Sequence, residues 1–235
     1  MVLKVYGSDV TTCTRRIATI LHELQVPFEL IKIDLKNKQN KTEEFKKYQP
    51  FGQIPYIVRF SCFPSARLLV LLSASAQDDD GFILFETRAI GRYLVAKHQA
   101  GAGLELIPSD PKKHALFEQA AAFEQSNFDP AGSEIGLQFH LRRLGWGFDQ
   151  AVVDKNMPLF EQRLEGYNTI LGKTRYLAGD ELTLADLFHL PIAPFVAEGS
   201  DVFEKYPNVA CWVKELSARP SWLAYKDGVV STLAY

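Results

Sequence analysis

The hydrophobic pattern of this chain changes near residue 113, and that change constrains the fold more than any other feature. Residues 1–98 mix strand and helix signals in the order β-α-β and then β-β-α. Residues 99–112, rich in glycine, proline and aspartate, are interpreted as a linker, and residues 113–235 carry helical periodicity. We therefore expect an α/β domain, with helices on the faces of a compact sheet, followed by an all-α domain.

The first helix is predicted from two adjoining signals. A cluster of capping side chains at residues 11–14 follows a short strand over residues 3–6. Apolar residues then recur on one helical face, which should turn toward the core: Cys13, Ile17, Ile20, Leu21 and Leu24. Further strands are expected at residues 28–33, 56–57 and 82–85, and the next helix opens at residues 86–88.

Composition excludes several classes of protein. The 26 basic and 28 acidic residues give a net charge of −2, so no positive field would gather nucleic acid. There is no run of about 18 apolar residues, so we expect no membrane span. Strand-like sequence starts at the N-terminus without a leader, which predicts a cytoplasmic location. Cys13, Cys62 and Cys211 are too far apart for a disulfide framework or a metal cage, so no metal is expected.

A second helix start is marked in the helical half. Thr183 and Asp186 have the spacing of a capping box, in which each side chain accepts a hydrogen bond from the other residue's backbone. The predicted helix runs from Leu184 to about Val196 and is apolar on most sides, so it should be buried.

Five segments resemble, in order and at the right separations, the soluble glutathione transferases, and the phi class in particular. They are residues 5–17, 49–55, 84–90, 128–130 and 177–186. In the third segment, Thr87 stands where the family signature has serine. The resemblance covers nearly the whole chain. It implies a thioredoxin-like N-terminal domain plus an all-α C-terminal domain, which is the glutathione transferase fold.

The resemblance also implies an activity. Such an enzyme conjugates the glutathione thiolate to small hydrophobic electrophiles in detoxification, and it forms a homodimer. Glutathione is then a co-substrate, and no cofactor is expected. The same site would support glutathione-dependent reduction of organic hydroperoxides. The alternative is a non-enzymatic carrier or regulatory protein of the same fold that binds glutathione or another ligand without turnover.

The chemistry requires a group that stabilises a thiolate. A free thiol with a pKa of about 8.5 is only slightly ionised at neutral pH, and the thiolate is the nucleophile. A helix N-terminus and a hydroxyl donor both favour the anion. Thr11 occupies the place of the phi-class catalytic serine, so we predict that it is the catalytic residue. The alternatives are that Thr11 is only an N-cap, or that Thr12 takes the role.

The glutathione-binding residues are expected on three segments. The backbone of Ile54, held by a cis-Pro55, would pair with the cysteinyl part of the tripeptide like an added strand, with Gln53 nearby. Thr87 as an N-cap would leave N–H groups for the γ-glutamyl carboxylate, and Glu86 would take the ammonium. Asn40-Lys41 stands where the family has His-Lys, so Lys41 would hold the glycyl carboxylate; alternatively it is a solvated loop charge.

The second substrate and the dimer contact are less defined. Val10 should border the pocket, and three aromatic residues of the helical half could line it or belong to the core: Phe117, Phe123 and Phe128. Phe51 lies in a loop where its ring would be exposed in a monomer. The resemblance makes it a dimer key that inserts into the partner subunit, and the alternative is local packing.

The cysteines are assigned structural roles. Cys13 lies two residues past Thr11 on the apolar face of the helix, which favours a buried position over a mixed-disulfide reductase. Cys211 lies in the apolar run around Trp212 and Val213, so it is interpreted as structural.

Residues 58–77 interrupt the expected hairpin between the last two strands. They contain no acidic residue and include Leu-Leu-Val-Leu-Leu, unlike a polar hairpin tip. Removing them joins Ile57 to Asp78 at the family's usual spacing. Because valine and glutamine codons can carry the consensus ends of an intron, we interpret the segment as a retained intron; the alternative is a genuine partner-binding loop.

Overall fold

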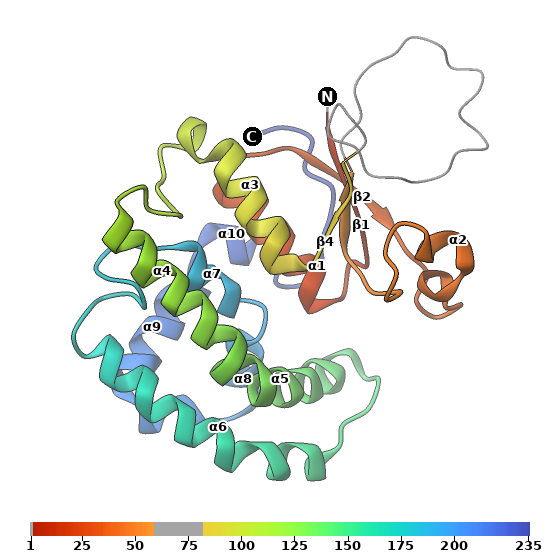
Figure 1. The fold of residues 1–235 in the computed structure, drawn as a ribbon. Coiled ribbons are helices and arrows are strands. Elements are labelled where there is room, and N and C mark those ends of the chain that lie inside the picture. The colour runs from red at the N-terminus through yellow and green to blue at the C-terminus, as the bar shows by residue number, and fades with distance from the viewer. Residues whose placement is uncertain (1, 59–81) are drawn as a thin grey trace, which may run out of the picture. The chain divides into compact units, whose positions relative to one another are not determined.

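The computed structural model describes residues 2–58 and 82–235, and the chain divides into two units (Figure 1). The N-terminal unit comprises Met1–Leu104 together with Ala224–Tyr235, and the helical unit comprises Glu105–Leu223. The predicted insertion lies outside the described residues except for Val58, which ends a strand. Among the described residues, no helix is long and apolar enough to cross a membrane.

The N-terminal unit is built on a four-stranded sheet with the order β2-β1-β3-β4. Strand β1 (Leu3–Gly7) pairs parallel with β2 (Phe28–Lys32) and antiparallel with β3 (Tyr56–Val58). Strand β4 (Leu84–Phe85) completes the sheet beside β3. The β-α-β and β-β-α order predicted from the sequence is confirmed.

Helices cover both faces of this sheet. Helices α1 (Thr12–Glu23) and α3 (Thr87–Ala102) pack together on one face, and the short η1 (Gln39–Lys41) and α2 (Glu43–Lys46) lie on the other (Figure 1). The apolar stripe of α1 is buried as predicted, with Ile17, Ile20 and Leu21 fully enclosed. Cys13 is an exception: it is half-buried, because the buried part of the helix begins one residue later.

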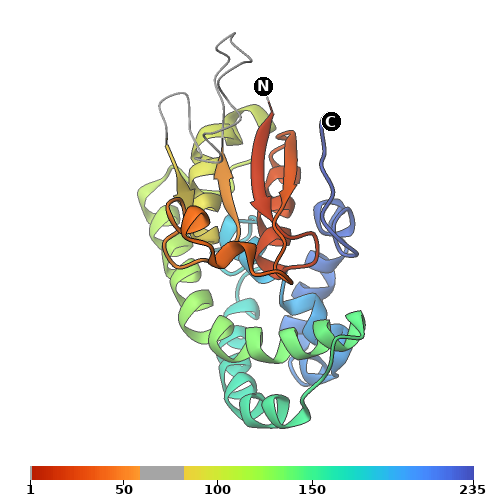
Figure 2. The same ribbon diagram turned by 90° about the vertical axis from the view of Figure 1, so that its right-hand side faces the viewer.

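The last residues of the chain complete the N-terminal unit. Phe28 and Thr232 exchange two backbone hydrogen bonds, N–H to O=C, of 2.7 and 3.0 Å. The Leu30 N–H donates to Ser231 Oγ at 2.9 Å. Residues 224–235 therefore lie along the edge of β2 that faces away from β1. Figure 2 shows this C-terminal segment, in blue, beside the sheet. This differs from the expected domain boundaries, which placed residues 113–235 in one domain.

Helix α3 of the N-terminal unit continues through Ala102 into the predicted linker of residues 99–112, and the helical unit starts within the same predicted linker, at Glu105. Its elements follow in order: α4 (Pro111–Phe123), η2 (Glu124–Phe128), α5 (Asp129–Leu144), α6 (Gln150–Leu171), α7 (Leu184–His189), α8 (Ala193–Gly199), η3 (Val202–Lys205), α9 (Pro207–Ser217) and α10 (Pro220–Leu223).

The capping box at the start of α7 is confirmed, with both reciprocal hydrogen bonds present. The single helix predicted from Leu184 to Val196 is wrong, because α7 ends at His189 and α8 begins at Ala193. Pro191 explains the interruption, since proline lacks the N–H that a continuous helix needs and clashes with the preceding turn. Both helices are buried, as expected.

Candidate active site

Thr11 lies at the N-terminus of α1, where it occupies the N-cap position in an extended conformation. Among the described residues, its side chain accepts no capping hydrogen bond from the helix backbone. Its Oγ1 lies 2.8 Å from Oγ1 of Thr14 and 3.4 Å from the Ser8 carbonyl oxygen. Thr11 is also partly exposed. The hydroxyl and the first-turn N–H groups therefore face the same open end of the helix.

Thr14 is the buried partner of Thr11. It has no exposed surface, and its Oγ1 accepts a hydrogen bond from the Ser8 N–H at 3.1 Å. A Cβ on Gly7 would lie 2.5 Å from this oxygen, so Gly7 permits the close approach of α1 to the end of β1. The sequence analysis assigned no role to Thr14, although it stood in the capping cluster.

Two buried arginines of α1 donate hydrogen bonds to the segments that adjoin this helix. Arg15 donates from Nη1 to the Val10 carbonyl at 2.8 Å and from Nε to the Tyr225 carbonyl at 3.1 Å. Arg16 donates from Nη1 to Thr87 Oγ1 at 2.9 Å. Sequence reasoning missed both arginines, because hydropathy assigns charged side chains to solvent. Their guanidinium groups fix the loop before Thr11 and the start of α3.

The start of α3 presents a second set of backbone N–H groups. The N-cap is Glu86 rather than Thr87, and it adopts a positive φ of 69°. This left-handed conformation is uncommon for a residue other than glycine. The expectation of a Thr87 cap is thus corrected, because the Thr87 hydroxyl is turned inward to accept from Arg16. The Glu86 carboxylate is exposed, and no side chain caps α3 among the described residues.

The loop before β3 is held from within. The Ile54–Pro55 peptide bond is cis, as predicted. Buried Gln49, which sequence reasoning missed, accepts from the Gln53 N–H through Oε1 at 3.0 Å. The Gln53 side chain itself is exposed, and Ile54 is half-buried. The loop therefore exposes Gln53 and part of Ile54 at its surface.

Asn40 and Lys41 contact the same loop from η1. The Asn40 Nδ2 donates to the Gly52 carbonyl at 2.7 Å, so its amide ties η1 to the loop. Gly52 has a φ of 61°, and a Cβ there would lie 2.7 Å from the Asn40 carbonyl oxygen. The exposed Lys41 places Nζ 3.4 Å from the Phe51 carbonyl. The Lys41 ammonium therefore stays close to the loop that carries Gln53.

The remaining predicted site residues differ in exposure. Val10 is half-buried beside Thr11, and Phe51 is 66 % exposed with its ring 6.2 Å from that of Phe85. In the helical unit, Phe123 is half-buried, whereas Phe117 and Phe128 are almost fully enclosed in the core. A second substrate would reach those two rings only after the core rearranged, so their predicted lining role conflicts with this packing.

The cysteines lie nearer the surface than expected. Cys13 is half-buried rather than enclosed in the core, and Cys211, interpreted as structural, is exposed. Its helix, α9, turns Val209, Trp212 and Val213 to the core instead. Cys62 lies outside the described residues. Within residues 2–58 and 82–235, no cluster of His, Cys, Asp or Glu could hold a metal ion.

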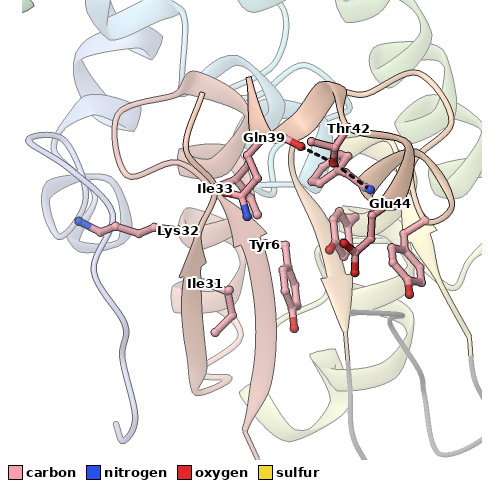
Figure 3. Close-up of a pocket in the computed structure, with 10 residues that line it drawn as sticks. Tyr6, Ile31, Lys32, Ile33, Gln39, Thr42 and Glu44 are labelled. Carbon is pink, nitrogen blue, oxygen red and sulfur yellow. Dashed lines mark hydrogen bonds between the residues drawn. The ribbon is translucent and has the colours of Figure 1, made fainter. Parts of the chain in front are cut away.

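A separate cavity of about 450 Å³ lies on the α2 face of the sheet (Figure 3). The rings of Tyr6 and Tyr56 line it, stacked with centroids 4.7 Å apart. Burial raises the pKa of both phenols, so both stay protonated at neutral pH. The described residues that line it include none of those predicted to bind glutathione.

Comparison with known proteins decides the family. Residues 12–97 match the model of the glutathione S-transferase N-terminal domain, and residues 128–220 match that of the C-terminal domain. The chain is 36 % identical to glutathione S-transferase PM239X14 of Arabidopsis thaliana over 213 residues, which cover 89 % of each chain. The chain belongs to the glutathione S-transferase family. As a glutathione S-transferase, it joins the thiol of glutathione to electrophilic substrates.

Further relatives of this glutathione S-transferase support the assignment. Glutathione S-transferase hmp2 of Hypomyces subiculosus is 36 % identical over 234 residues, covering 95 % of this chain and 97 % of the relative. The crystal structure of glutathione transferase F7 from Populus trichocarpa matches with a TM-score of 0.81 and 33 % identity, over 96 % and 98 % of the two chains. The relatives include plant enzymes of the F, or phi, class, in agreement with the resemblance in the sequence.

Proposed function

We propose that Thr11 is the catalytic residue that stabilises the glutathione thiolate. The observation that carries this role is the position of its hydroxyl, which lies at the N-terminus of α1 without capping the helix. Among the described residues, the Thr11 side chain accepts no hydrogen bond from the first-turn N–H groups. Lowering the thiol pKa by about two units requires roughly 2.7 kcal/mol. A hydrogen bond to a charged group contributes about 1.5–3 kcal/mol, and a helix N-terminus about 0.3–1 kcal/mol. Together these two effects reach the required magnitude.

The tripeptide would be held by the segments that flank Thr11. The Ile54 backbone, placed by cis-Pro55, would pair with the cysteinyl residue, and Gln53 would donate nearby. The uncapped first turn of α3, which starts at Thr87, would take the γ-glutamyl carboxylate, and Glu86 its ammonium. Lys41 would hold the glycyl carboxylate. A related glutathione S-transferase I, 30 % identical with a TM-score of 0.77, was solved with lactoylglutathione bound.

The electrophile would lie against Val10, which is half-buried rather than enclosed. Of the three aromatic residues proposed for the second substrate, Phe123 is the half-buried one. We further propose that the enzyme is a cytoplasmic homodimer with Phe51 as its key, that it needs no cofactor besides the glutathione substrate, and that it also reduces organic hydroperoxides. The exposed ring of Phe51 supports the dimer contact, since a large apolar side chain at the surface is typical of an interface anchor.

Conjugation of glutathione to an aryl halide tests the role of Thr11. Thr11→Ala should lower kcat/KM at least tenfold, because it removes the hydroxyl donor, whereas Thr11→Ser should retain activity. Thr12→Ala is the matched control, since Thr12 is the neighbouring, partly exposed threonine of the same turn. Unchanged turnover in Thr11→Ala would contradict the proposal. Glutathione binding without turnover in the wild type would favour the carrier role.

A further inference from the structure

The hydroxyl of Thr11 has to keep its single proton available if it is to stabilise a thiolate. Each hydroxyl group has one proton to donate and two lone pairs that accept. Thr11 and Thr14 lie 2.8 Å apart through their Oγ1 atoms, and either one can be the donor of that hydrogen bond. If Thr11 donates to Thr14, its proton is used within the protein. The other acceptor that the structure gives this proton, the Ser8 carbonyl, lies 3.4 Å away, too long for a strong hydrogen bond, and a thiolate is the better acceptor. The direction of the shorter Thr11–Thr14 bond therefore determines whether Thr11 can act on the substrate.

The surroundings of Thr14 provide it with a donor and leave its own proton available. The Ser8 N–H donates to Thr14 Oγ1 at 3.1 Å, so one lone pair of this oxygen is occupied. The carbonyl one turn before Thr14 belongs to Val10, and it accepts from Arg15 at 2.8 Å. The Thr14 side chain is completely enclosed, which excludes bulk water as an acceptor. Among the described residues, the Thr11 oxygen is the acceptor that the structure places within hydrogen-bond distance of the Thr14 hydroxyl.

We propose that Thr14 is a positioning residue for thiolate activation, an inference that rests on the proposed role of Thr11. The hydrogen bonds then run in one direction: Ser8 N–H to Thr14, Thr14 O–H to Thr11, and Thr11 O–H to the glutathione thiolate. Hydrogen bonds arranged in such a chain polarise one another and strengthen the last donor. Accepting from Thr14 also fixes the rotamer of Thr11, whose hydroxyl does not cap the helix.

The pKa of the enzyme-bound glutathione thiol tests this series of hydrogen bonds. It is measured from the ultraviolet absorbance of the thiolate as the pH is varied. Thr14→Val keeps the shape and removes the hydroxyl, and it should raise the bound-thiol pKa by about half a unit. The acid limb of the kcat/KM profile should move by the same amount, which is about a twofold loss at pH 6.5 and about a threefold loss at pH 5.5. Thr14→Ser retains the hydroxyl and should restore the wild-type pKa.

A second background separates positioning from a merely structural role. In a Thr11→Ala enzyme, Thr14→Val should cause no further rise in the thiol pKa, because the Thr11 hydroxyl through which Thr14 acts is already absent. A rise of equal size in both backgrounds would overturn the inference, since Thr14 would then act by holding the loop. A wild-type pKa in Thr14→Val, or a raised one in Thr14→Ser, would overturn it as well.

Failure of the two proposals is distinguishable. If Thr11→Ala leaves the bound-thiol pKa unchanged, the role of Thr11 itself is wrong, and the role of Thr14 falls with it. If Thr11→Ala raises the pKa and Thr14→Val does not, only the inference about Thr14 is wrong. Should Thr14→Val fail to fold, Thr14→Cys serves instead, because a thiol has a similar size and is only a weak donor. It should then give a raised pKa.

Discussion

Asp186 provides the sharpest test of how the helical unit is held together. Its carboxylate is completely buried and accepts four hydrogen bonds. The Leu177 N–H and the Trp212 indole N–H donate to Oδ1 at 3.0 and 3.1 Å, and the Thr183 N–H and hydroxyl donate to Oδ2, each at 2.9 Å. One side chain thus joins the start of α7 to α9 and to the loop between α6 and α7.

Asp186→Ala leaves three buried N–H donors without their acceptor. Each unsatisfied donor costs about 1–3 kcal/mol, so we expect a loss of about 4 kcal/mol in the free energy of unfolding once partial hydration is allowed for. That is a large share of the roughly 5–15 kcal/mol that stabilises a typical protein. Urea unfolding followed by tryptophan fluorescence measures it, with the protein concentration held fixed.

The matched control is Asp180→Ala, a few residues away. Asp180 is exposed and accepts a long hydrogen bond of 3.3 Å from the Arg175 N–H, so its removal should change the free energy of unfolding by less than about 0.5 kcal/mol. A loss below about 1 kcal/mol in Asp186→Ala would refute the reasoning, because it would mean that the three donors find other partners.

Further predictions concern pH, glutathione binding, assembly and the insertion. Burial raises the pKa of Asp186 more than its hydrogen bonds lower it, so the folded state keeps this proton to a higher pH than the unfolded state does. The free energy of unfolding of the wild type, relative to that of Asp186→Asn, should therefore fall as the pH rises from about 4. Urea unfolding at several pH values measures it. Lys41→Ala should raise KM for glutathione several-fold with little change in kcat, in initial-rate kinetics. Phe51→Ala should weaken the proposed dimer at least thirtyfold in sedimentation, which corresponds to about 2 kcal/mol, and Phe82→Ala should not. Deleting residues 58–77 leaves residues 78–83 to connect the paired Ile57 and Leu84, an ordinary length for a connection between two elements, so glutathione binding should persist in calorimetry.

The parts of the fold that were predictable depend on local pattern. Alternation identified the strands, helical spacing identified the buried stripe of α1, and the Thr183–Asp186 spacing identified the start of α7. The end of α7 was not predicted, although Pro191 marks it, because the apolar pattern continues through the break into α8. Local signals therefore located where elements begin better than where they end.

The parts of the site that were missed depend on contacts distant in sequence. Thr11 was predicted from its place in a motif, whereas Arg15 was not, because its burial depends on the carbonyl of Tyr225, 210 residues away. Hydropathy has no means of showing that a guanidinium will find such a partner. Thr14 was missed for a different reason: a threonine in a capping cluster has several ordinary roles, and only the distances to Ser8 and Thr11 distinguish them.

The return of residues 224–235 to the first unit affects the order in which the enzyme is made. The Val229 N–H donates to the Asp9 carbonyl at 2.9 Å, and Tyr225 accepts from Arg15, so the segment leading to Thr11 receives neighbours from the end of the chain. Some 120 residues separate Leu104 from Ala224. A ribosome working at about 5–20 residues per second needs roughly 6–24 s to add them. A nascent chain that stops within the helical unit therefore lacks these contacts, and the segment that leads to Thr11 receives them only after residues 224–235 have been made.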